Sequence, residues 1–183
     1  MNFIPTKLAG CFIIEPKIIT DERGYFMESF NEQTFQNGVG QAVHFVQDNQ
    51  SFSTKGVLRG LHYQCGDFAQ AKLVRVLQGE VLDVAVDLRP DSVTFGQYEA
   101  VNLSAENQKQ FFVPRGFAHG FLVLSKSATF FYKCDHFYNK QSEGGLIYND
   151  ATVNINWQFA ASDLIISDKD LIQPNLANAR KVW

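Results

Sequence analysis

The sequence has no large excess of charge of either sign and no long apolar run. Its 183 residues include 16 lysines and arginines against 19 aspartates and glutamates, a net charge of −3. No overall basic field is therefore available to attract nucleic acid or an anionic membrane, and an anionic ligand would depend on local cations. No apolar run approaches the ~20 residues of a membrane-spanning helix. We therefore expect neither a nucleic-acid nor a membrane partner.

Cysteines are also few. Cys11, Cys65 and Cys134 are odd in number and widely spaced, so they form neither a disulfide framework nor a CxxC metal pair. The first residues lack the basic stretch and long apolar stretch of a signal peptide. These features predict reduced cysteines and a cytoplasmic location.

What is abundant is phenylalanine, with 17 residues in a chain that is 45% hydrophobic and 19% charged. This composition is that of an ordinary globular protein, and the aromatic content suits a β-rich core. The length favours a single domain over residues 1–183.

Many short strands separated by turn signals are predicted along the chain. Pro16 divides residues 11–19 into two strand pieces, as is typical of a sheet edge. Asn31 is expected to cap a short helix that runs through Asn37 and stops at Gly38. Further strands are expected at Tyr25–Phe30, Phe45–Ser53, Ala71–Leu77, Val81–Leu88, Gln97–Leu103, Gln110–Val113, His119–Leu124, Thr129–Cys134 and Leu146–Tyr148.

The turn at Gln78-Gly79 joins two β-branched alternating runs, which predicts a hairpin of Ala71–Leu77 with Val81–Leu88. Strands at this spacing indicate an all-β jelly-roll sandwich or barrel with short peripheral helices.

The segment Gly56–Gln64, GVLRGLHYQ, places a single histidine, His62, in an otherwise apolar run. This histidine is either a packed core residue or a reactive base. Arg59 and Lys72 flank it, and cations near an apolar run are costly unless they face something anionic. The preceding strand is unusual because Gln47, Asp48 and Asn49 are consecutive. It is either a solvated edge or the wall of a polar cavity.

Two motifs resemble those of the cupin fold. Gly56-x5-His62-x-Gln64 resembles the opening of the first, and Pro114–His119 matches the P-x-G-x-x-H of the second. Only His62 and His119 remain of the four metal ligands of a metal-binding cupin. Because a stable zinc or iron site usually takes about three protein ligands, no metal is predicted.

A longer set of segments resembles the dTDP-4-dehydrorhamnose 3,5-epimerase family. These segments are DERGYFMESF, FVQDNQSFSTKGVLRGLHYQ, AKLVRVLQGEVLDVAVDLR, FFVPRGFAHGFLVLS, FYKCDHFY and SEGG. The resemblance runs from about residue 21 to residue 150, with a weaker match at Ser167–Asp170. It implies a cupin-type barrel that acts without a cofactor on a 4-keto-6-deoxyhexose linked to dTDP.

The reaction that the resemblance implies inverts C3 and C5, whose hydrogens are acidified by the C4 ketone. Each inversion needs a base, a group that stabilises the enolate, and an acid on the opposite face. The resemblance assigns the base to His62, whose imidazole ordinarily titrates near about pH 6.5. It assigns the proton donor to Tyr132, which without the resemblance would be interpreted as a core tyrosine. It assigns the aspartate that orients His62 to Asp170, with Asp83 or Asp168 as alternatives.

The resemblance also implies the substrate contacts. Lys72 and His119 are expected at the sugar ketone and hydroxyls, His119 being otherwise a remnant of a lost metal site. Arg23 and Arg59 are expected at the diphosphate, which suits the guanidinium fork. The other expected contacts are Phe26, Glu28, Gln47, Asp48, Asn49, Tyr138, Glu143 and Lys169, with Tyr138 stacking on the base. Arg23, Phe26 and Glu28 are expected to come from a partner subunit, which implies a homodimer; otherwise Arg23 and Glu28 belong to a solvated face.

Several functions remain open at this point. The first is epimerisation at both C3 and C5, as in the formation of dTDP-4-dehydro-L-rhamnose from dTDP-4-dehydro-6-deoxy-D-glucose. The alternatives are inversion of one carbon only, action on a related nucleotide sugar, a silent cupin that only binds a nucleotide sugar, and a metal-dependent cupin oxygenase or isomerase.

Overall fold

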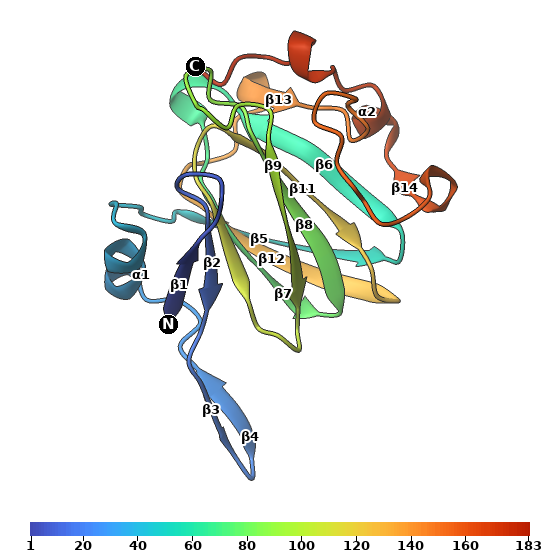
Figure 1. The fold of residues 1–183 in the computed structure, drawn as a ribbon. Helices are drawn as coiled ribbons and strands as arrows, with labels where there is room; N and C mark the ends of the chain where they lie inside the picture. Colours follow the sequence, from blue (N-terminus) through green and yellow to red (C-terminus); the bar gives the residue numbers. More distant parts are fainter.

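The computed structural model describes residues 1–183, which form two facing β-sheets with short helices at the periphery (Figure 1). The first sheet has the strand order β1-β2-β10-β7-β12-β5, and the second has the order β13-β6-β11-β8-β9 with β14 added in parallel to β6. The strands of the first sheet are β1 (Asn2–Pro5), β2 (Phe12–Glu15), β5 (Gln47–Thr54), β7 (Lys72–Gln78), β10 (Gln110–Val113) and β12 (Ser127–Cys134). Those of the second are β6 (Val57–Gln64), β8 (Glu80–Asp87), β9 (Tyr98–Ser104), β11 (Phe117–Val123), β13 (Glu143–Gly145) and β14 (Ile165–Ile166). This arrangement confirms the predicted all-β jelly-roll class.

Alternation along the strands builds the core between the sheets. Val74 and Val76 of β7 and Phe130 of β12 face Val81 and Ala85 of β8 in one buried cluster. Residues between these, such as Leu82 and Val84, point to the opposite face of β8 and are also buried. Strand β8 is therefore covered on both sides, and a polar side chain on it must find a partner inside the protein.

The outer faces of the two sheets are covered differently. The C-terminal segment, including Trp157 and Val182, packs on the outer face of the second sheet. The helix α1 (Glu32–Val39) covers part of the first sheet through Phe35, which packs on Phe112. The remaining helical segments are α2 (Asp168–Leu171) and the 3-10 turns Gly66–Phe68, Lys140–Ser142, Ala161–Asp163 and Leu176–Asn178. None of these helices has the length and apolar character needed to cross a membrane.

The predicted hairpin of β7 with β8 is wrong, because the two strands belong to different sheets. Strand β7 pairs with β10 and β12, whereas β8 pairs with β9 and β11. Gly79, at φ 78°, makes the corner that carries the chain across the core. A β-carbon there would lie 2.0 Å from the carbonyl oxygen of Ser127. A tight turn between two alternating strands is compatible with either connection, so the pattern alone did not distinguish them.

Other boundaries also differ from prediction. Helix α1 continues past Gly38 and ends at Val39, capped by Gly40, whose left-handed backbone places its N–H to donate to the carbonyl of Gln36. Gly38 serves a different purpose, since a β-carbon there would overlap the ring of Phe3. The strand expected at Leu146–Tyr148 lies three residues earlier, as β13, where Gly144 permits close approach to the ring of Tyr63.

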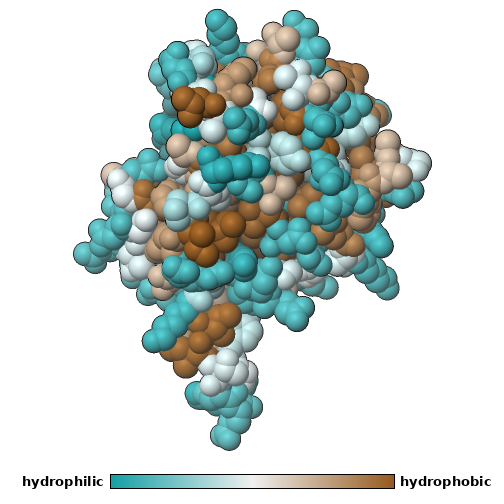
Figure 2. Space-filling view, viewed as in Figure 1, coloured by the Kyte–Doolittle hydropathy of each residue, from teal (hydrophilic) through white to brown (hydrophobic).

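Strands β3 (Ile18–Asp21) and β4 (Gly24–Met27) form a separate two-stranded hairpin that projects from the body (Figure 1). We call this hairpin the arm. The predicted strand Tyr25–Phe30 is thus shorter, ending at Met27. Ile18, Ile19, Tyr25 and Phe26 are all exposed on it, and Figure 2 shows apolar residues on the arm behind a hydrophilic tip. These apolar residues therefore have no covering surface within their own chain. An isolated hairpin is marginally stable at best in water, so we expect another surface to cover the arm.

Candidate active site

A cavity of about 640 Å³ opens between the two sheets and the C-terminal segment. The three predicted catalytic residues, His62, Tyr132 and Asp170, all line it. Five of the predicted substrate contacts line it as well, namely Asn49, Arg59, Lys72, His119 and Lys169. Residues from both halves of the chain are therefore brought to one site by the barrel.

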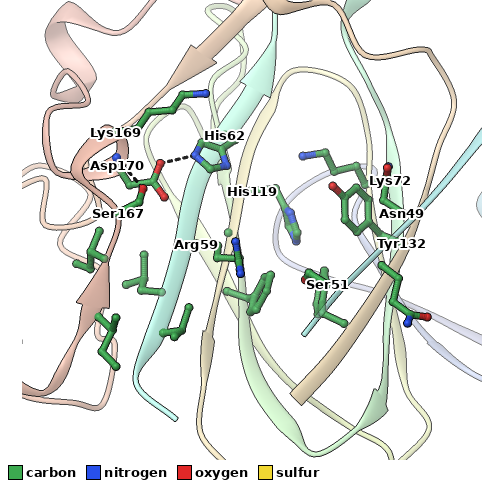
Figure 3. A pocket seen from close by; sticks show the side chains of 18 residues that line it. Asn49, Ser51, Arg59, His62, Lys72, His119, Tyr132, Ser167, Lys169 and Asp170 are labelled. Atoms are coloured by element: carbon green, nitrogen blue, oxygen red, sulfur yellow. Dashed lines mark hydrogen bonds and ion pairs between the residues drawn. The ribbon is translucent and has the colours of Figure 1, made fainter. Parts of the chain in front are cut away.

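His62 lies on β6 and is bonded to a carboxylate from the C-terminal segment (Figure 3). Its Nε2 lies 2.6 Å from Oδ1 of Asp170, which is the first of the three predicted aspartates. Asp170 is placed by the short helix α2, whose N-cap Ser167 accepts from its backbone N–H. Burial would raise the pKa of Asp170, but the hydrogen bonds from His62, Gly60 and Ser167 bring it below its ordinary value. Asp170 is therefore an ionised acceptor that holds the proton on Nε2 of His62 and leaves Nδ1 for a bound molecule.

Tyr132 and Lys72 lie on the wall opposite His62, on strands β12 and β7 (Figure 3). The Lys72 ammonium is 5.8 Å from the centre of the Tyr132 ring. Burial raises the pKa of the Tyr132 phenol, an effect that Cys134 reinforces and Arg59 opposes. Burial lowers the pKa of Lys72, whereas Cys134 and Asp83 oppose that shift. The wall thus presents a protonated phenol beside a lysine that is held in a less polar environment than water.

His119 lies between these two walls, on β11 directly opposite His62 of β6. Its Nε2 is bonded to both carboxylate oxygens of Asp83, at 2.9 and 3.0 Å. Asp83 is fully buried on β8 and was predicted only as an alternative partner of His62. The site therefore contains two histidine–carboxylate pairs, of which the resemblance implied one. The missed signal is a charged residue at the inward, apolar position between Val81 and Ala85.

The polar strand β5 is both an edge of its sheet and a wall of the site. Its inward residues Asn49 and Ser51 line the cavity, and Gln47 lines an adjoining hollow of about 210 Å³. Asp48 points to the other face, where its carboxylate is 3.0 Å from Nζ of Lys133. Of the consecutive polar residues, Asp48 is therefore not brought to the site of its own chain.

Three predicted residues form a chain of contacts at the rim of the adjoining hollow. The Tyr138 hydroxyl donates to Oε1 of Glu143 at 3.0 Å, and Lys169 donates to Oε2 at 2.8 Å. The Lys169 bond lowers the pKa of Glu143, while the Glu143 bond raises that of Tyr138. The exposed ring of Tyr138 therefore lies at the rim, held by its hydrogen bond to the Glu143 carboxylate.

Arg23, Phe26 and Glu28 are not brought to the cavity of their own chain. Arg23 and Phe26 belong to the exposed arm, where Arg23 is paired with Asp21. Glu28 is the first residue after the arm, which ends at Met27. Gln64 occupies the position at which a metal-binding cupin has a histidine, and it does not line the cavity either. Its side-chain amide bonds the backbone of Phe68, Phe137 and Asn139. No group of three or more His, Cys, Asp or Glu side chains is placed to hold a metal ion.

The fold and the cavity define a cupin-type barrel protein with an acid–base site between its sheets. The sequence model of the dTDP-4-dehydrorhamnose 3,5-epimerase family matches residues 5–178. The dTDP-4-dehydrorhamnose 3,5-epimerase of Shigella flexneri is 55% identical over 171 residues, which are 93% of each chain. The chain belongs to this family and is an enzyme of the isomerase class, as the resemblance implied.

Solved structures agree with this assignment. The crystal structure of dTDP-4-dehydrorhamnose 3,5-epimerase from Elizabethkingia anophelis matches with a TM-score of 0.95 and 55% identity, over 97% of each chain. The dTDP-6-deoxy-D-glucose-3,5-epimerase from Legionella pneumophila, solved in complex with dTDP-4-keto-L-rhamnose, matches with a TM-score of 0.93 and 50% identity. That match covers 97% of this chain and 93% of the other.

Proposed function

We propose that this protein inverts C3 and C5 of a dTDP-linked 4-keto-6-deoxyhexose, converting dTDP-4-dehydro-6-deoxy-D-glucose into dTDP-4-dehydro-L-rhamnose. The observation that carries the proposal is the placement of His62 and Tyr132 on facing walls of one cavity, with Lys72 beside Tyr132 and His119 between the two walls. A hexose ring bound between the walls would have a base on one face and an acid on the other.

The steps move protons only. Nδ1 of neutral His62 takes the hydrogen from a carbon next to the ketone, and the bonding electrons move to the C4 oxygen as an enolate. The Lys72 ammonium stabilises this oxyanion, which it does more strongly in the cavity than in water. The Tyr132 hydroxyl then delivers a proton to the opposite face of the carbon, and solvent later restores both residues. Repetition at the second carbon completes the product.

The remaining polar groups bind the nucleotide in this proposal. Arg59 reaches the cavity with its Nε bonded to Ser53 and its other guanidinium nitrogens free of protein partners, which suits a diphosphate. Gln47 and Asn49 supply amide donors along β5. Tyr138, supported by Glu143 and Lys169, offers an exposed ring on which a base can stack.

Proton NMR of dTDP-4-keto-6-deoxyglucose incubated with the protein in deuterated solvent tests the proposal. We expect deuterium at both C3 and C5 and accumulation of the L-rhamno product. Labelling and inversion at one carbon only would reduce the activity to mono-epimerisation. Unlabelled substrate that nevertheless binds would identify a silent nucleotide-sugar binder and refute the proposal.

We also propose that the protein is a homodimer in which each arm completes the partner's site. The arm exposes four large apolar side chains, and it carries Arg23 and Phe26 away from its own cavity. Apolar surface of this kind on a projecting element favours an interface. In a symmetric dimer the two arms would be exchanged reciprocally.

Mixing two inactive variants tests the shared site. His62→Ala disables the cavity of its own chain, whereas Arg23→Ala disables the cavity that receives its arm. After subunit exchange we expect roughly a quarter of wild-type activity to return, because half of the dimers are mixed and each contains one intact site. Sedimentation of the wild-type protein as a monomer, or absence of any recovery in mixtures shown to contain mixed dimers, would contradict the proposal.

A further inference from the structure

Asp83 is a fully buried carboxylate whose hydrogen bonds all go to one group. Both of its oxygens accept from Nε2 of His119, and it lies behind that ring, outside the lining of the cavity. His119 is itself buried, with only 6% of its side chain exposed, and lies in the cavity lining. Asp83 can therefore influence a bound molecule chiefly through His119.

The electrostatics of this pair extend to Lys72. Burial lowers the pKa of the Lys72 ammonium, and the Asp83 carboxylate opposes this shift. The two groups are therefore close enough for their charges to interact. A buried carboxylate is stable only when a positive charge is paired with it, and the Asp83–His119 pair is buried on both sides, whereas 41% of the His62 side chain is exposed. With Nε2 committed to Asp83, Nδ1 is the His119 nitrogen that remains for the cavity.

We propose that Asp83 is a positioning residue for the epimerisation, which holds His119 as an imidazolium whose Nδ1–H donates to the enolate oxygen beside Lys72. His119 and Lys72 would then carry two positive charges against the one negative charge of Asp83. One net positive charge remains, which the enolate neutralises. Without the carboxylate, His119 would present a lone pair to the oxyanion, and Lys72 would stabilise it alone. This inference rests on the proposed function.

A purely structural role does not account for Asp83. Its neighbours on the inward face of β8 are Val81 and Ala85, and apolar packing there would stabilise the barrel without a buried charge. Replacing a buried ion pair by apolar groups is often neutral or stabilising. A charge kept at such a position points to the chemistry of the cavity that it supports.

The isosteric variant Asp83→Asn removes the charge and keeps an acceptor for Nε2–H. We expect kcat to fall by about 10²-fold, as when one oxyanion donor is lost, with KM within about twofold. The melting temperature should be unchanged or higher. The matched control is Asp87→Asn on the same strand, because Asp87 is equally buried but bonds Arg89, Ser92 and Thr94. That variant should melt at a lower temperature and keep its kcat.

A double-mutant cycle separates action through His119 from a general effect on the fold. In a His119→Gln background, Asp83→Asn should lower kcat far less than it does with His119 present, because its route through His119 is gone and only its effect on Lys72 remains. A similar fall in kcat in both backgrounds, or wild-type kcat in Asp83→Asn alone, would overturn the inference. Wild-type protein in the same assay keeps the two proposals apart, since its inactivity would instead refute the proposed function.

Discussion

His62→Ala is expected to abolish both deuterium exchange and inversion at C3 and C5. The imidazole is the group on its wall that combines a free nitrogen with a carboxylate that orients it, Asp170 at 2.6 Å. Loss of a positioned base commonly costs on the order of 10²–10⁴ in rate. Because both carbons flank the same ketone, we expect the two exchange rates to fall together.

Substrate deuteration followed by NMR, with dTDP binding measured in parallel, checks this expectation. Binding should persist, because the proposed diphosphate and base contacts are on other residues. The control is His44→Ala, which removes an exposed histidine paired with Glu32 near α1. Near-normal exchange at either carbon in His62→Ala would show that another group is the base there.

Part of the acid–base site could be predicted from the sequence. The P-x-G-x-x-H and G-x5-H motifs put His119 and His62 on neighbouring strands, and the register places them directly opposite each other. Strand alternation could predict that Gln47 and Asn49 share a face, whereas Asp48 faces away. Asp170 lies 108 residues from His62 in the chain, and only the resemblance to a family connected the two.

Other features depend on long-range packing that no local pattern encodes. Alternation in Val81–Leu88 is the same whether β8 pairs with β7 or crosses to the second sheet, so the hairpin prediction failed. The same crossing buries β8 on both faces and turns Asp83 toward His119. The arm is a further case, because its local sequence predicts strands but does not say that their apolar residues lack a covering surface in their own chain.

Tyr132→Phe is expected to uncouple proton removal from inversion. The phenol hydroxyl makes no hydrogen bond within the chain and is open to the cavity, whereas the ring packs near Phe130. Phenylalanine therefore keeps the packing and removes only the proton that is delivered to the far face. His62 can still form the enolate, since Lys72 and His119 are untouched. The imidazolium then returns a proton, exchanged with solvent, to the face from which it came.

The ratio of exchange to inversion is the informative quantity. In Tyr132→Phe we expect inversion to fall on the order of 10²–10⁴, the usual cost of a lost general acid, while exchange into unconverted substrate falls far less. Tyr98→Phe is the matched control, because Tyr98 lies on β9 and its hydroxyl accepts from the backbone of Asn156, away from the cavity. If exchange and inversion decline in equal proportion, the phenol contributes to enolate formation rather than to protonation. If inversion stays at the wild-type rate, the acid on the far face is a different group or water, and the opposition of His62 and Tyr132 across the sugar is not the basis of the reaction.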